Sequence, residues 1–156
     1  MESDKQKTHN KLTESLQGLL VKNYDAEKGF IKAMQHLEHP DLRGFMQRQA
    51  AKRSNFATEL DRELHALNET PKSSGTLAAD LHRTWIELKN TILSADVSTV
   101  LEECLRGEKN SAHEYETVLQ SHEFPQHLRT VINNQLSKIY RTIDDLQQLD
   151  DITKLQ

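Results

Sequence analysis

The stretch LTESLQGLLVKNYDAEKGFIKAMQHLEHPDL, Leu12 to Leu42, decides the fold. Its apolar residues recur every three, four or seven positions, which is the spacing of one face of an α-helix. His39 then ends the helix, because the residue before proline is pushed out of the α region, and Pro40-Asp41 opens another. So short a break predicts two long antiparallel helices lying side by side. The apolar stripe of the first helix consists of Leu12, Leu16, Leu19, Ala26, Phe30, Ala33 and Leu37.

The second half of the chain repeats this plan. The segment 68–76 collects Pro, Gly, Ser, Thr and Asn, and is the obvious linker. A short helix is expected over 77–93, followed by long helices over 97–121 and from residue 125 onward. The predicted fold class is all-α: a ferritin-like four-helix bundle of two helical hairpins joined by the linker and the short crossover helix. Residues 1–10 are expected to be disordered, 11–151 to form one bundle domain, and 152–156 to be a frayed tail.

Composition agrees with amphipathic helices and narrows the partners. The chain has 156 residues, of which 35% are hydrophobic and 28% charged, and its net charge is -4. Its basic residues are scattered, so we expect no nucleic-acid partner, and no apolar run approaches the ~18 residues needed to span a membrane. Cys104 is the single cysteine and the N-terminus has no apolar segment of a signal peptide. These features favour a cytoplasmic protein.

Polar residues interrupt the apolar stripes near the middle of all four long helices. In an antiparallel bundle the helix middles meet at one level, so we expect a buried polar layer across the core. A buried carboxylate requires a partner, and Arg53 is the expected partner of Glu108. The predicted layer consists of Asn23, Glu27, Gln49, Arg53, Glu108 and Gln135.

Ferritin-like carboxylate proteins place two metal ions at this level of the bundle. That site takes a Glu from each of two helices and a Glu-x-x-His from each of the other two, because iron and manganese prefer carboxylate and imidazole donors. Glu27 and Glu108 supply the two glutamates, but residues 49–55 and 135–141 contain no histidine and add Lys and Arg. We therefore expect no cofactor, with a reduced iron or manganese site around Glu27 and Glu108 as the alternative.

Two segments resemble a known family. SGTLAADLHRTWIELK, Ser74 to Lys89, and LEECLRGEKNSAHEYE, Leu101 to Glu116, are similar to the signature segments of a bacterial ferritin-like domain of unknown function, often labelled stress-associated. The resemblance covers roughly residues 12–149 and implies the ferritin-like fold, with little assigned chemistry. His82, Trp85 and Glu108 stand at positions typical of that family.

The chain also departs from this family at two positions. Lys28 stands where members tend to carry an acid, and Ile143 where they tend to carry a histidine. Both departures weaken a metal-binding role.

The sequence thus favours a non-enzymatic, cytoplasmic ferritin-like bundle, with a stress-related role implied by the resemblance, that acts through self-association or protein contacts. The alternative is a metal-binding oxidoreductase or storage-type protein with a reduced site. Tyr24, Ile31 and Met34 lie off the main stripe of the first helix. They would form either the face of a homodimer or a surface that packs against the crossover helix.

Overall fold

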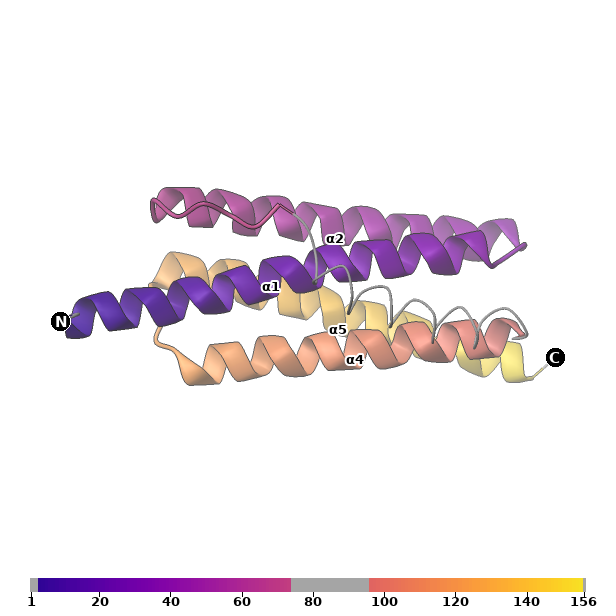
Figure 1. The fold of residues 1–156 in the computed structure, drawn as a ribbon. Helices are drawn as coiled ribbons and strands as arrows, with labels where there is room; N and C mark the ends of the chain where they lie inside the picture. The colour runs from indigo at the N-terminus through magenta and orange to yellow at the C-terminus, as the bar shows by residue number, and fades with distance from the viewer. Residues whose placement is uncertain (1–2, 74–95, 156) are drawn as a thin grey trace.

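Four long helices form the described part of the chain. A computed structural model describes residues 3–73 and 96–155. Its helices are α1 (Asp4–Gln35), α2 (Pro40–Ala66), α4 (Val97–Ser121) and α5 (Gln126–Lys154), as Figure 1 shows. No strand occurs within these two ranges. The short helix expected over 77–93 lies outside the described residues.

The helices pack as two hairpins laid against each other. α1 pairs with α2 and α4 pairs with α5, while α1 also contacts α4 and α2 also contacts α5. α2 and α4 are therefore diagonal partners across the bundle. They run in the same direction in Figure 1, so α2 ends and α4 begins at opposite ends of the bundle, with residues 67–96 connecting them. This long connection between two hairpins is the ferritin-like arrangement that the sequence predicts.

The first helix begins earlier than the sequence indicates. α1 starts at Asp4, so the expectation that residues 1–10 are disordered is wrong for most of that segment. Ser3 explains the start, because its hydroxyl accepts a hydrogen bond from the Gln6 amide at 3.2 Å. The carboxylate of Asp4 also lies in the first turn, where the helix dipole favours negative charge.

The last helix also extends further than expected. α5 continues to Lys154, into the segment predicted to fray. The Lys154 ammonium lies 2.9 Å from Glu102 Oε1 and 3.1 Å from Asp150 Oδ2. Asp150 in turn accepts a hydrogen bond of 2.7 Å from the Ser98 hydroxyl. These contacts join the end of α5 to the start of α4.

The interior is divided into two apolar clusters. One cluster lies toward the end where α1 begins and contains Leu16, Phe56 and Tyr115, and the other lies toward the α1–α2 turn and contains Phe30 and Met46. Buried polar side chains lie between the two clusters. No helix in the described ranges is long and apolar enough to cross a membrane.

Candidate functional site: the polar centre of the bundle

Every helix contributes polar side chains to the level between the two apolar clusters. Each of these residues lies on the inward-facing side of its helix. The apolar residues on the same side of that helix are buried in the core. The buried members are Asn23 on α1, Gln49 and Arg53 on α2, Glu108 and Tyr115 on α4, and Gln135 and Thr142 on α5. We call this set the polar centre.

A buried salt bridge lies within the polar centre. Arg53 Nη2 donates to Glu108 Oε1 at 2.7 Å, and the two side chains are only 2% and 3% exposed. The second guanidinium nitrogen, Nη1, donates to Asn23 Oδ1 at 2.8 Å. The Arg53 guanidinium also lies 5.9 Å from the centroid of the Phe56 ring. This is the Arg53–Glu108 pair predicted from the sequence, and it joins the diagonal helices α2 and α4.

A chain of hydrogen bonds extends from the salt bridge to the remaining helices. Asn23 Nδ2 donates to the Tyr115 hydroxyl at 2.8 Å and to the Leu19 carbonyl at 2.8 Å. Tyr115 donates its hydroxyl proton to Gln135 Oε1 at 2.6 Å, and Gln135 Nε2 donates to the Phe56 carbonyl at 3.3 Å. All four helices are thus linked through one network.

Gln49 belongs to a second, smaller set of contacts. Its Oε1 accepts a hydrogen bond of 2.9 Å from the Thr142 hydroxyl on α5. Lys52 donates to the same hydroxyl oxygen at 3.3 Å from a partly buried position. Burial lowers the pKa of Lys52, and the nearby Asp145 carboxylate opposes that shift.

Glu27 departs from the predicted polar layer. Its side chain is only partly buried, and the hydrogen bonds that join the polar centre do not include it. On α1 the buried face of the helix includes Asn23 and Phe30, and Glu27 lies at the edge of that face. The two glutamates of the alternative metal site therefore do not share one buried environment.

Burial also makes two protonated groups of this region hard to ionise. It raises the pKa of the Tyr115 hydroxyl to about 12, although the Arg53 charge opposes the shift. It likewise raises the pKa of the Cys104 thiol to about 12, and the Glu108 charge adds to that effect. The Cys104 sulfur lies 4.0 Å from the Met46 sulfur. A thiol with so high a pKa is a poor nucleophile and a poor metal ligand at neutral pH.

The donor set of the polar centre does not fit a di-metal site. Its one carboxylate, Glu108, is bonded to a guanidinium, and amides stand on α2 and α5 where imidazoles would be needed. In residues 3–73 and 96–155 no three His, Cys, Asp or Glu side chains gather closely enough to hold a metal ion. What the arrangement can do is bind four helices in one register through charge and hydrogen bonds.

Sequence reasoning missed two members of the polar centre. Tyr115 and Thr142 were assigned to no polar layer, although each lies on an inward face of its helix. For Tyr115 the signal was available, because a buried tyrosine hydroxyl usually finds a hydrogen-bond partner. The family-type positions His82 and Trp85 lie outside the described residues.

The fold and this buried centre define a ferritin-like helical bundle. The chain belongs to the family described as Domain of unknown function (DUF2383), whose model matches residues 11–121. The ferritin-like domain of unknown function expected from the sequence is therefore confirmed.

Solved structures agree on the fold. One is described as a dodecameric thioferritin, the bacterioferritin-related protein from Bacteroides fragilis; it is 17% identical, with a TM-score of 0.71, and the match covers 94% of this chain and 89% of that one. Another is described as a ferritin-like, diiron-carboxylate protein from Bacillus anthracis, 16% identical, with a TM-score of 0.59 and coverage of 96% and 95%. At these identities the likeness shows the fold alone. A search of curated proteins found no match.

Proposed function

We propose that this chain is a non-enzymatic ferritin-like bundle that acts through self-association or contacts with other proteins. The observation that carries the proposal is the buried Arg53–Glu108 salt bridge at the level of the bundle where ferritin-like carboxylate proteins hold metal. A guanidinium there supplies the positive charge that a metal ion would bring to the inward glutamate.

The arginine also opposes metal entry by electrostatics. A cation entering the polar centre would meet the charge of Arg53 at short range in a medium of low dielectric. Freeing Glu108 for coordination would leave the guanidinium buried without a counter-charge, which is strongly unfavourable. The chain's own residues therefore hold the centre in a closed, internally neutralised state.

Self-association is supported by the outer surface and by analogy. Among the described residues the large hydrophobic side chains that are exposed are Tyr140, Ile152 and Leu155, all on or just after α5. One solved structure of the same fold is described as dodecameric. Tyr24, Ile31 and Met34 pack partly against the core, so only a fraction of each is available to a second copy. A cytoplasmic location and a stress-related role belong to the same proposal.

Metal analysis tests the first half of the proposal. The protein is purified without chelator, incubated anaerobically with excess Fe(II) or Mn(II), desalted, and its metal content measured by mass spectrometry. We expect far less than one ion per chain, with the same value for Glu108→Ala and for the surface control Glu114→Ala. One or two ions per chain, lost in Glu108→Ala and kept in Glu114→Ala, would establish the metal-binding alternative instead.

Sedimentation velocity over a wide concentration range tests the second half. We expect a dimer or larger assembly whose population rises with concentration. A single monomeric species at the highest concentration would overturn self-association and leave contacts with other proteins as the proposed activity.

A further inference from the structure

The interface between α2 and α5 is spanned mainly by long side chains. The backbones of these two helices approach each other less than those of the other neighbouring helix pairs. Lys138 Nζ on α5 lies 5.9 Å from the centroid of the Phe56 ring on α2, and His127 Nε2 on α5 lies 2.7 Å from Glu63 Oε1 on α2. Lys52 lies near the middle of this interface, beside the polar centre.

Lys52 is a partly buried lysine without an ionic partner among the described residues. Its ammonium donates a hydrogen bond of 3.3 Å to the hydroxyl oxygen of Thr142, which is a neutral group. The lysine salt bridges in the described part of the chain are formed by Lys22 and Lys154, and not by Lys52. The charge of Lys52 is thus partly removed from water with no carboxylate in contact to compensate it.

The surroundings of Lys52 favour the uncharged amine. Burial lowers the pKa of Lys52, because an ammonium loses solvation when water is removed from it. The Asp145 and Glu108 carboxylates oppose this shift from a distance. The Arg141 and Lys138 charges add to it. Only the uncharged amine has the lone pair that attacks a carbonyl carbon, so partial burial beside other cations makes a lysine nucleophilic.

A buried amide beside Lys52 has an unused donor. Gln49 is only 6% exposed, and its hydrogen bond from the Thr142 hydroxyl, at 2.9 Å, uses its carbonyl oxygen. Its NH₂ group donates to no acceptor among the described residues. That group still touches solvent, because the Thr13 hydroxyl is the one fully buried side-chain nitrogen or oxygen there without a partner. Lys52 and Gln49 are therefore joined through one hydroxyl, with a free N–H donor on Gln49.

We propose that Lys52 is a site of covalent acylation by small activated acyl compounds such as acyl phosphates. The neutral Nζ attacks the acyl carbon, and the bond from that carbon to the phosphate oxygen breaks. The phosphate leaves with the electron pair and takes up the proton that the nitrogen releases. In the product, the amide N–H donates to Thr142 Oγ1 and the acyl oxygen accepts from the NH₂ group of Gln49. Acylation also removes the uncompensated positive charge.

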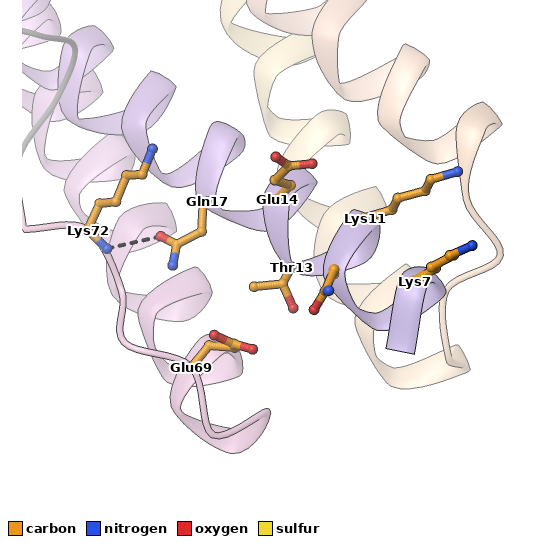
Figure 2. Close-up of a pocket in the computed structure, with 8 residues that line it drawn as sticks. Lys7, Lys11, Thr13, Glu14, Gln17, Glu69 and Lys72 are labelled. Atoms are coloured by element: carbon orange, nitrogen blue, oxygen red, sulfur yellow. Dashed lines mark hydrogen bonds between the residues drawn. The ribbon is translucent and has the colours of Figure 1, made fainter. Parts of the chain in front are cut away.

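This inference does not depend on the function proposed above, because it concerns neither self-association nor metal. Acetyl phosphate is the probe that tests it. The folded full chain is treated at neutral pH, and the acetylation of each lysine is followed with time by peptide mass spectrometry. The internal references are Lys7 and Lys11, which are exposed and whose side chains extend away from α1 in Figure 2.

We expect Lys52 to be acetylated several times faster than Lys7 or Lys11. The neutral fraction of an amine rises about tenfold for each unit by which its pKa falls, and partial burial of Lys52 offsets some of this gain. In concentrated urea the difference should vanish, because the unfolded chain exposes all three lysines equally.

A charge placed beside Lys52 tests the cause of its reactivity. Gln49→Glu supplies the missing counter-charge and should slow acetylation of Lys52 to the rate of the reference lysines. Gln47→Glu, the same change at an exposed position on α2, should leave the rate unchanged.

Three results would overturn the proposal. The first is a rate at Lys52 no greater than at Lys7 and Lys11 in the folded chain. The second is a difference that persists in urea, which would show an effect of local sequence and not of the fold. The third is an equal effect of Gln49→Glu and Gln47→Glu, which would show that the contact between Gln49 and the amine is irrelevant.

Discussion

Two places in the bundle bury a carboxylate, and they neutralise it in different ways. At the polar centre, Glu108 meets Arg53 with both side chains almost fully buried. At the end of the bundle, Asp150 is equally buried but meets the half-exposed Lys154 and the hydroxyl of Ser98. Water can replace the partner at the end, whereas nothing can replace it at the centre. The same type of ionic contact should therefore matter much more in one place than in the other.

The largest expected effect comes from breaking the central pair. Glu108→Ala leaves the guanidinium of Arg53 buried without its counter-charge, so we expect the free energy of unfolding to fall by about 3–5 kcal/mol. Urea denaturation measures it. The surface control Glu114→Ala, which removes an exposed pair with Lys22, should cost about 1 kcal/mol or less.

A double variant sharpens this result. Arg53→Met combined with Glu108→Leu removes both charges, so most of the loss seen for Glu108→Ala should be recovered. A double variant as unstable as Glu108→Ala would show that packing at these positions, and not the unpaired charge, causes the loss.

The next effect comes from the hydroxyl that links three helices. Tyr115→Phe leaves the carbonyl oxygen of Gln135 buried and without its donor, and we expect a loss of about 2 kcal/mol in the free energy of unfolding. The matched change Tyr140→Phe removes an exposed hydroxyl bonded to Glu116 and should change stability by about 0.5 kcal/mol or less. Similar losses in the two variants would remove the distinction between buried and exposed sites.

A smaller and more local effect is expected at the end of the bundle. Asp150→Asn keeps the shape of the side chain but removes the charge that attracts Lys154, so the loss should be about 1 kcal/mol. Hydrogen exchange should quicken in the last turns of α5 while the middle of the helix stays protected. A loss of protection along all of α5 would mean that the two sites are coupled.

The ionisation of two buried side chains has the smallest effect on stability at neutral pH. This effect becomes larger only at alkaline pH. Burial raises the pKa of Cys104 from its ordinary value of 9.0 to about 12, and that of Tyr115 from 10.0 to about 12. Between pH 9 and 12 the unfolded chain therefore releases protons that the folded chain keeps, so stability is complete below pH 9 and falls as pH rises toward 12.

Urea denaturation at pH 8, 9, 10 and 11 follows this decline. Cys104→Ala should make the decline shallower, because one of the two raised groups is gone. A slope unchanged by Cys104→Ala would show that the thiol is not buried as deeply as the structure indicates.

The helices and much of the polar centre follow from periodicity, and the errors have specific physical causes. The apolar stripes of the helices predict that Asn23 and Arg53 face the core, because apolar residues about one turn away lie on the same side of the helix. The prediction that Glu27 is buried was wrong because a step of four residues, repeated along a helix, drifts away from the period of 3.6 residues per turn. A single polar residue can then lie just inside or just outside the buried face of the helix.

The ends of the helices were harder to predict than their middles. The cap at Ser3 and the contacts of Asp150 and Lys154 lie in polar stretches without an apolar stripe. Their order depends on tertiary contacts such as the 2.7 Å bond from Ser98 to Asp150, which pairs residues 52 positions apart.

The diagonal path of the central salt bridge has a consequence for assembly. Arg53 belongs to the α1–α2 hairpin and Glu108 to the α4–α5 hairpin, so each half of the chain carries one sign of buried charge. If two copies of the first hairpin came together as a bundle, two guanidinium groups would face each other across the core, and two copies of the second would oppose two carboxylates. Each hairpin is thus complementary to the other and incompatible with itself, which directs the halves of one molecule, or of an exchanged pair of molecules, toward the correct partner.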